Sequence, residues 1–361
     1  MMNKIMTKVA TVFLCVLGAC SVGNQDESVE SQYAGSWWGI ENKKEAVLEF
    51  LNQSSGQKIL SGQESTLWDT PWGDWFPSSR DEYVSQRSGK LPAVFSSDFG
   101  DFKNRDLGSE EQVREKRSMV VNTAKQYARQ GSLVMLSYHM CPPDLQSGCA
   151  FEQMSRFTQD DPYPEWKLNQ ILQPGTEMNR KHLERIDEIA GYLKELEDEG
   201  IVVMWRPFHE INKSWFWWGA SSRSADLYRQ MHDRMVGHHG LKNLIWVYSV
   251  NYWDGENDSP RRYYPGDWYV DMLGVDIYIE HGHEYSQRIY DGMMDLADDN
   301  QPIAITENGM LPEDFHRFRN EQPNWVLWAT WFGYESRWPD FKYSDIYNHE
   351  DVVTRDEMYD F

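Results

Sequence analysis

Two glutamates close apolar segments of strand length, and the residues around them are of the types that acid–base chemistry requires. Glu210 ends the segment Ile201–Glu210, and Glu307 ends the segment Ile303–Glu307. Two carboxyl groups can act as proton donor and nucleophile on one bond if their surroundings keep one protonated and the other ionised. Hydrolysis of a glycosidic bond with retention of configuration uses such a pair, about 5–5.5 Å apart. The two glutamates therefore indicate a retaining glycosidase.

The sequence around Glu210 is rich in basic and aromatic side chains. A single glutamate at a strand end is more often a salt-bridged surface residue, but here Arg206, His209 and several tryptophans share the segment Trp205–Gly219. The whole chain holds 17 tryptophans among 361 residues. Flat aromatic faces suit neutral sugar rings, and a tryptophan-rich core is the alternative explanation. The concentration around Glu210 favours a carbohydrate ligand.

Apolar segments rich in β-forming residues alternate with helical patterns along the chain. Several of these segments lack polar alternation, which is typical of parallel strands covered on both faces. Helical patterns over Ser109–Gln130, Glu177–Glu199 and Ser222–His238 are each followed closely by a glycine. The strand-like segments are Lys58–Glu64, Leu91–Asp98, Leu133–His139, Ile201–Glu210, Asn243–Asn251, Met272–Tyr278, Ile303–Glu307 and Val326–Phe332.

This alternation predicts an α/β fold, a single (β/α)8 TIM barrel. A doubly wound open sheet is the alternative, because spacing along the chain does not show that the sheet closes. In a barrel, the carboxyl ends of the strands form the catalytic face. Glu210 and Glu307 would then meet there from the fourth and seventh strands.

The segment RPFHEINKSWFWWG, which begins at Arg206, resembles the fourth-strand signature of glycoside hydrolase family 26. That family consists chiefly of β-mannanases of the retaining barrel clan. The motifs ILSGQE, SYHM, YYPGDWYVDMLGVDIY, ITENG and VLWATWFG fall where the family pattern places them. The resemblance therefore extends from Lys58 to the carboxyl terminus.

The resemblance implies roles for the groups nearest the reacting bond. Glu210 would be the general acid/base and Glu307 the nucleophile. Tyr278 would hydrogen-bond the nucleophile and keep it ionised. Arg206 would act in the same direction, since a guanidinium beside a carboxylate favours its charged form.

The resemblance also implies a set of substrate-binding residues. His209 would bind substrate at the cleavage site, and His139 and Trp215 would line the neighbouring subsites. Trp331 would offer a stacking floor to the sugar ring before the scissile bond, with Trp328 as the alternative three residues earlier.

The activity implied is retaining, endo-acting hydrolysis of β-1,4-mannosidic linkages in mannan, glucomannan or galactomannan, without a cofactor. Three alternatives stay open. One is an exo-acting, mannobiose-releasing enzyme, because the loop Cys141–Pro174 could block the cleft at one end. The second is a β-xylanase or mixed-linkage glucanase of the same family. The third, from a different class, is a non-catalytic glycan-binding surface lipoprotein.

The amino terminus has the pattern of a bacterial lipoprotein signal. Lys4 and Lys8 precede the apolar run Val9–Leu17, which is too short to span a bilayer. Small residues then lead to Cys20, the candidate lipidation site, and the following Ser21 resembles the pattern of outer-membrane sorting. We expect a signal peptide over 1–19, a lipidated cysteine and acidic tether over 20–36, and a catalytic domain over 37–361. The protein would be anchored to a membrane, the outer membrane being favoured.

The remaining cysteines and the charge constrain other partners. Cys141 and Cys149 are candidates for a disulfide, which an exported protein can form. A zinc site fits less well, because only His139 lies nearby. The net charge of −22 argues against nucleic acid as a partner. We expect a monomer with no metal site, and we interpret Glu280–Glu284 as a solvated loop.

Overall fold

The computed structural model describes residues 39–65, 80–100, 102–103, 109–278, 285–298, 301–334 and 337–360. The expected signal peptide, Cys20 and the tether lie outside the described residues, and so does the Glu280–Glu284 segment. The chain divides into two units at residues 37–38, and the described residues all belong to the second. No helix among them is long and apolar enough to cross a membrane.

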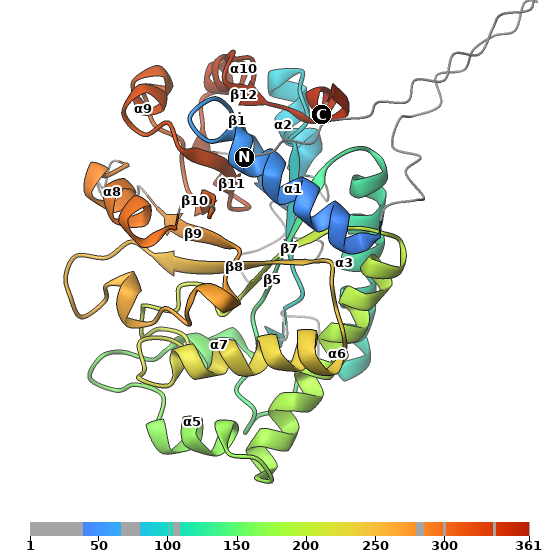
Figure 1. Ribbon diagram of the computed structural model, residues 1–361, viewed down its shortest axis with the longest axis vertical. Coiled ribbons are helices and arrows are strands. Elements are labelled where there is room, and N and C mark those ends of the chain that lie inside the picture. Colours follow the sequence, from blue (N-terminus) through green and yellow to red (C-terminus); the bar gives the residue numbers. More distant parts are fainter. Residues whose placement is uncertain are drawn as a thin grey trace, which may run out of the picture. The chain divides into compact units, whose positions relative to one another are not determined.

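Parallel strands form a closed barrel at the centre of the described chain (Figure 1). Two short strands, β1 (Ile59–Leu60) and β2 (Gly62–Glu64), both pair with the last barrel strand, β11, and act as one interrupted strand. β11 also pairs with β10, so the sheet closes on itself. The barrel strands after β2 are β3 (Val94–Asp98), β5 (Leu133–Tyr138), β7 (Val203–Pro207), β8 (Leu244–Asn251), β9 (Met272–Ile277), β10 (Ile303–Asn308) and β11 (Trp325–Thr330). The predicted (β/α)8 barrel is confirmed, and the open sheet is wrong.

Three shorter strands lie outside the barrel. β12 (Val352–Val353) extends the sheet beside β1. β4 (Phe102–Lys103) and β6 (Cys149–Ala150) pair with each other.

Helices alternate with the barrel strands and cover them. The Ser109 side chain caps α3 and forms a capping box with Gln112, which satisfies donors that a helix start leaves free. The helix expected over Ser222–His238 begins at Ser224 and finishes in a π-helical turn over Asp233–His238. The helices are α1 (Ile40–Ser54), α2 (Arg80–Ser88), α3 (Glu110–Arg129), α4 (Phe151–Ser155), α5 (Glu165–Leu172), α6 (Glu177–Asp198), α7 (Ser224–His232), α8 (Gln287–Leu296), α9 (Phe315–Glu321) and α10 (Asp340–Tyr347).

Helix α1 contacts the chain at the amino-terminal ends of β7 and β9. Lys43 donates to the carbonyl of Gly200 before β7, and Lys44 pairs with Asp271 before β9 at 2.8 Å. Apolar residues of α1 such as Leu51 pack on the floor of the barrel. The helix therefore closes the end of the barrel opposite the strand ends that carry Glu210 and Glu307.

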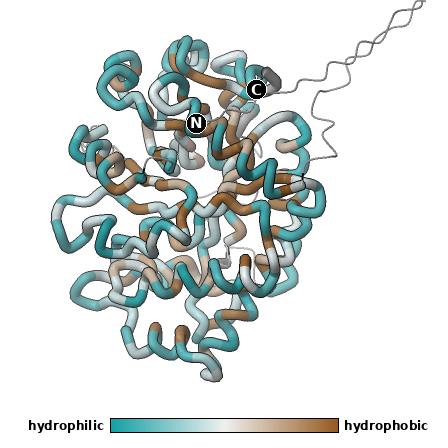
Figure 2. Tube along the Cα trace, viewed as in Figure 1, coloured by the Kyte–Doolittle hydropathy of each residue, from teal (hydrophilic) through white to brown (hydrophobic). Residues whose placement is uncertain are grey.

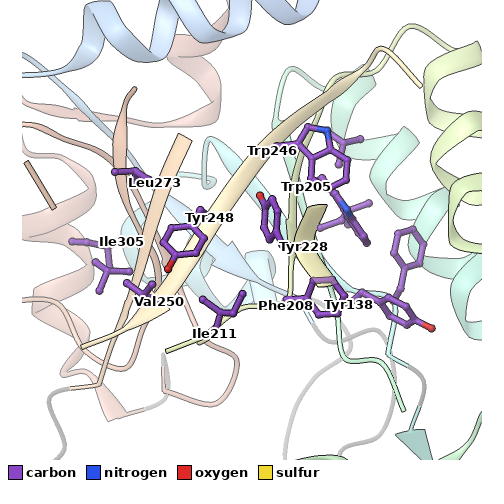
Figure 3. Close-up of a cluster of buried hydrophobic side chains, with 14 of the residues drawn as sticks. Tyr138, Trp205, Phe208, Ile211, Tyr228, Trp246, Tyr248, Val250, Leu273 and Ile305 are labelled. Atoms are coloured by element: carbon purple, nitrogen blue, oxygen red, sulfur yellow. The ribbon is translucent and has the colours of Figure 1, made fainter. Parts of the chain in front are cut away.

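Apolar side chains fill the space between the strands and the outer helices. Figure 2 shows hydrophobic residues concentrated along the central strands. In Figure 3, Trp205 and Trp246 point from their strands toward the helical layer, where Tyr228 of α7 packs 5.8 Å from the Trp246 ring. Trp205, Trp217, Trp218, Trp246, Trp325 and Trp328 are fully buried. Much of the tryptophan content thus builds the core, as the alternative explanation proposed.

The fourth barrel strand ends earlier than predicted. β7 stops at Pro207, and Glu210 lies in the turn that follows. Proline has no N–H to continue the ladder. Phe208 and Glu210 then adopt positive φ angles of 49° and 53°, which turn the chain over the top of the barrel. The strand directs the chain toward the site, and a strained turn aims the carboxyl group.

Candidate active site

Inward-facing side chains change from apolar to polar toward the carboxyl end of the strands. On β8, Ile245 and Val247 belong to the apolar barrel floor, while Ser249 and Asn251 hydrogen-bond groups in the barrel interior. The same alternation on β7 places Arg206 above Met204. Because strand side chains repeat every two residues, each strand presents a floor residue and then a polar residue to the interior.

Glu307, on β10, receives a hydrogen bond on each carboxylate oxygen. Arg206 Nη2 donates to Oε1, and Tyr278 Oη donates to Oε2 at 2.5 Å. Glu307 is 4% exposed and Arg206 is completely buried. The carboxylate is thus paired with a cation and held in one orientation.

Glu210 receives hydrogen bonds from neutral donors instead. Asn251 Nδ2 donates to Oε1 at 2.6 Å, and Trp215 Nε1 donates to Oε2 at 2.5 Å. Asn251 is held in turn by Asn212, whose side chain accepts from the Asn251 N–H and donates to its carbonyl, each at 2.8 Å. The donors of Glu210 are therefore positioned by a second set of hydrogen bonds.

Burial raises the proton affinity of two carboxyl groups at the site. Burial, and then the nearby charge of Glu307, raise the pKa of Glu210 to about 7, although its two donors act in the opposite direction. Burial likewise raises the pKa of Asp276 well above its usual range, with the charge of Glu307 adding to the effect. Glu210 can therefore hold a proton near neutral pH.

The two glutamates lie close together. One carboxylate oxygen from each of Glu210, Asp276 and Glu307 lies within 4.8 Å of the others. Carboxyl groups this close are nearer to the spacing of retaining than of inverting glycosidases.

Beneath the pair, Arg206 is anchored by a buried polar layer. Its Nη1 lies 3.1 Å from Asp276 Oδ2, and Asp276 accepts a further hydrogen bond from Thr306 at 2.7 Å. Gly274 makes room for this threonine, because a Cβ at position 274 would lie 2.6 Å from Thr306 Oγ1. Asp276 thus fixes the guanidinium that faces Glu307.

A chain of hydrogen bonds connects three strand ends beside the two glutamates. Asp98, which ends β3, lies 3.0 Å from His139 Nδ1, and His139 Nε2 lies 3.0 Å from His209 Nε2. All three residues are at most 5% exposed. His209 is 1% exposed, so its ring packs within the wall of the site rather than on its surface.

Two partly exposed tryptophans line the site. Trp215 contacts Glu210, and the Trp331 ring lies 6.3 Å from the His139 ring. Trp328 is completely buried and packs against Phe315 and Tyr347 in the helical layer. Of the two tryptophans considered for the sugar floor, Trp331 is therefore the one beside the site.

The segment after β5 is held by several links. Cys141 and Cys149 form a disulfide with their Cα atoms 6.0 Å apart. Arg185 of α6 donates to the carbonyl of Pro142 at 3.0 Å, and Trp217 Nε1 donates to that of Met140 at 2.7 Å. These links fix the chain immediately beyond His139.

Several residues that complete the site were not predicted from the sequence. Asn251 and Asp276 lie at inward positions near the ends of strands that had been predicted, so the two-residue period could have indicated them. Asp98 also ends a predicted strand. Glu64, at the end of β2, ends a predicted strand as well. Burial raises its pKa to about 8, and the charges of Asp98 and Glu307 add to the effect.

A parallel (β/α)8 barrel with two buried glutamates after its fourth strand and on its seventh defines a glycoside hydrolase of the barrel type. The family model described as glycosyl hydrolase family 26 matches residues 40–357. The chain therefore belongs to glycosyl hydrolase family 26.

Characterised relatives and solved structures agree with this membership. The chain is 32% identical over 324 residues to a mannan endo-1,4-beta-mannosidase of Thermothelomyces thermophilus, a match that covers 87% of this chain and 61% of the relative. It is 30% identical to mannan endo-1,4-beta-mannosidase A of a Piromyces species, covering 87% of this chain and 49% of the relative. The chain thus spans about half to three fifths of the length of these curated relatives.

Among solved structures, GH26A of a Muricauda species superposes with a TM-score of 0.75 at 28% identity, covering 87% of this chain and 97% of the other. A β-mannanase from a symbiotic protist of the termite Reticulitermes speratus, complexed with gluco-manno-oligosaccharide, superposes with a TM-score of 0.72 at 25% identity. That match covers 87% of this chain and 94% of the protist chain.

Proposed function

We propose that this protein is a retaining, endo-acting β-1,4-mannanase that cleaves mannan, glucomannan or galactomannan. The observation that carries the proposal is the pair of glutamates with contrasting partners, whose carboxylate oxygens lie within 4.8 Å of each other. The relatives named mannan endo-1,4-beta-mannosidase support the choice of mannan as substrate.

In the first step, a Glu307 oxygen attacks the anomeric carbon while the bond from that carbon to the leaving oxygen breaks. Glu210 donates its proton to the leaving oxygen, and a covalent mannosyl ester of Glu307 forms. Arg206 and Tyr278 hold the attacking carboxylate from its two oxygens. The pKa of Glu210, raised to about 7 by burial and by the Glu307 charge, keeps the acid protonated beforehand.

In the second step, Glu210 removes a proton from water, and the water oxygen attacks the anomeric carbon as the ester bond breaks. Esterification has by then removed the negative charge of Glu307, one of the causes that raise the pKa of Glu210. The same carboxyl group is thereby converted from an acid into a base. Because the two glutamates supply acid, base and nucleophile, the reaction calls for no cofactor.

The other site residues take supporting roles in this proposal. Trp331 forms the floor under the sugar before the scissile bond, and Trp215 lines the site beside the acid. His139 and His209 form the wall next to the cleavage point. The burial of His209 restricts its direct contact with sugar, so its part in binding is played largely through His139.

A time course of products from linear mannan and galactomannan, made with the full chain, tests the proposal. A ladder of mixed mannooligosaccharides is expected from an endo-acting enzyme. Mannobiose alone from the earliest time points would contradict the endo mode, and release only from xylan or mixed-linkage glucan would contradict the substrate. Glu210→Ala and Glu307→Ala are the matched controls. If neither hydrolyses more slowly than the wild type, the catalytic assignment is wrong.

We also propose that the protein is a monomeric lipoprotein, acylated on Cys20 and attached to the outer membrane. The support is the order of basic residues, short apolar run and small residues before Cys20. Labelling of cells with a radioactive fatty acid should mark the wild type but not Cys20→Ala, and fractionation should place the label with the outer membrane. A soluble wild type without label would refute the anchor. Light scattering of the detergent-solubilised chain tests the monomer.

A further inference from the structure

The series of hydrogen bonds that joins Asp98, His139 and His209 beside the glutamates begins at a carboxylate that only accepts hydrogen bonds. Asp98 Oδ1 accepts from the backbone N–H of Gly100 at 2.6 Å and of His139 at 3.4 Å. Asp98 Oδ2 accepts from Ser137 Oγ at 2.6 Å and lies 3.0 Å from His139 Nδ1. Burial would raise the pKa of Asp98, but its interactions with His139 and the hydrogen bond from Ser137 outweigh burial and hold the pKa well below its usual range.

An ionised acceptor at this place dictates where the histidines carry their hydrogens. Because Asp98 can only accept, the His139 nitrogen that faces it must carry a hydrogen. The two facing Nε2 atoms of His139 and His209 are 3.0 Å apart, so one carries a hydrogen and the other accepts it. His209 Nδ1 has no hydrogen-bond partner in the described part of the chain. A hydrogen on His209 Nε2 is therefore the arrangement that leaves no buried N–H unpaired.

We propose that Asp98 is a positioning residue, which acts through His139 to fix the orientation and hydrogen placement of His209, the residue next to the acid/base. These hydrogen bonds connect the ends of β3 and β5 with the turn after β7, so they also hold three barrel strands together at the site. Only the expected effect of Asp98 on catalysis rests on the proposed function. The hydrogen placement itself is independent of substrate.

Asp98→Asn is the variant that reverses the direction of the hydrogen bond between His139 and His209. The two backbone N–H groups at Oδ1 cannot change direction, so the asparagine oxygen must stay there and its NH2 group must replace Oδ2. That NH2 group requires a bare Nδ1 on His139, which moves the His139 hydrogen to Nε2. His139 would then donate to His209 instead of accepting from it.

We expect Asp98→Asn to lower kcat/KM on mannan by about 10- to 100-fold, the order of magnitude known for residues that orient metal-bound histidines. In a His209→Phe background, the same change should lower kcat/KM by less than about threefold, because the histidine through which Asp98 acts is already absent. Equal fold losses in the two backgrounds, or an Asp98→Asn enzyme within twofold of wild type, would overturn the proposal. Asp187→Asn is the matched control. Asp187 lies on α6, away from the site, and contacts His239 at 2.7 Å. Its replacement should leave kcat/KM unchanged.

A second measurement does not depend on activity. Nitrogen-15 spectra of the histidine-labelled full chain, with His139 assigned by its loss in His139→Gln, report which ring nitrogen carries hydrogen. We expect hydrogen on Nδ1 of His139 in the wild type and on Nε2 in Asp98→Asn. An unchanged His139 pattern in the variant would overturn the inference even if activity fell. If the wild type hydrolyses no β-glycan, the proposed function fails, while these spectra still decide the role of Asp98.

Discussion

The two halves of the site hold the same functional group by different means. Glu307 lies on strand β10 and is held by a buried guanidinium and a tyrosine hydroxyl. Glu210 lies in a turn with positive φ and is held by an amide and an indole, both neutral. A cation next to a carboxylate favours the ionised form, whereas neutral donors leave burial as the dominant effect. In the proposed mechanism, this difference distinguishes the nucleophile, Glu307, from the acid, Glu210.

The Glu307 half also carries most of the charge of the site. Arg206 contacts both Asp276 and Glu307, so a single cation serves two buried carboxylates. In the described part of the chain, the two side chains that donate to Glu210 are both neutral. The Glu210 half is built from aromatic rings, amides and a disulfide-bonded segment. The contrast predicts different consequences for changes made in each half.

The largest difference between the halves should appear when either carboxyl group is removed. Glu307→Ala should reduce kcat by roughly 10⁴-fold or more on all substrates, because no ester can form. Glu210→Ala should cost about 10²- to 10⁴-fold on mannan and far less in the first step on an aryl mannoside whose leaving group needs no proton. Comparing mannan with an activated aryl mannoside checks this. Equal losses in kcat/KM, which reports the first step, for Glu210→Ala on both substrates would contradict its role as acid.

The next effect should come from removing the cation. Arg206→Met leaves Asp276 and Glu307 buried without their shared partner, which should lower the free energy of unfolding by about 3–5 kcal/mol and strongly reduce kcat. Denaturant unfolding and steady-state kinetics measure both quantities. Arg206→Met with Asp276→Asn is the control, since it removes one of the two acidic groups left buried without their partner and should recover part of the stability. A single variant as stable as wild type would show that the cation does not hold this half.

A smaller effect concerns the pH dependence of the Glu210 half. Because the acid must be protonated for the first step, kcat/KM should fall as the pH rises through about 7, the pKa of Glu210. The hydrogen bond from Trp215 lowers this pKa, so Trp215→Phe should move the alkaline limb to higher pH while reducing kcat/KM about tenfold. pH–rate profiles of both proteins test the sign. A limb that moves to lower pH would contradict the assignment.

The smallest effect on catalysis should follow loss of the disulfide. Replacing Cys141 and Cys149 by serine opens a short loop and gives the unfolded chain more conformational entropy. The free energy of unfolding should therefore fall by about 2–3 kcal/mol. Arg185 and Trp217 still hold the segment after His139, so kcat/KM should change by less than about threefold. Thermal unfolding and kinetics, compared with reduced wild type, check this. A large kinetic loss would mean that the disulfide itself positions the Glu210 half.

Much of the fold could be predicted because its signals are local. Unbroken apolar segments mark strands covered on both faces, and Ser109 marks the start of α3 because its hydroxyl accepts from the helix backbone. The end of β7 was predicted three residues too late, at Glu210 instead of Pro207. Apolar character continues through Phe208, whereas the positive φ angles that end the strand are imposed by the packing of the turn.

The sequence by itself determined the eight-strand alternation and the two glutamates, because each is a pattern of neighbouring residues. The closure of the sheet, the choice of Trp331 rather than Trp328 beside the site, and the partners of each carboxyl group were decided only by the tertiary structure. Asn251 reaches Glu210 across 41 residues, and Arg206 reaches Glu307 across 101. Contacts of that separation depend on where whole strands are placed, so no local pattern records them.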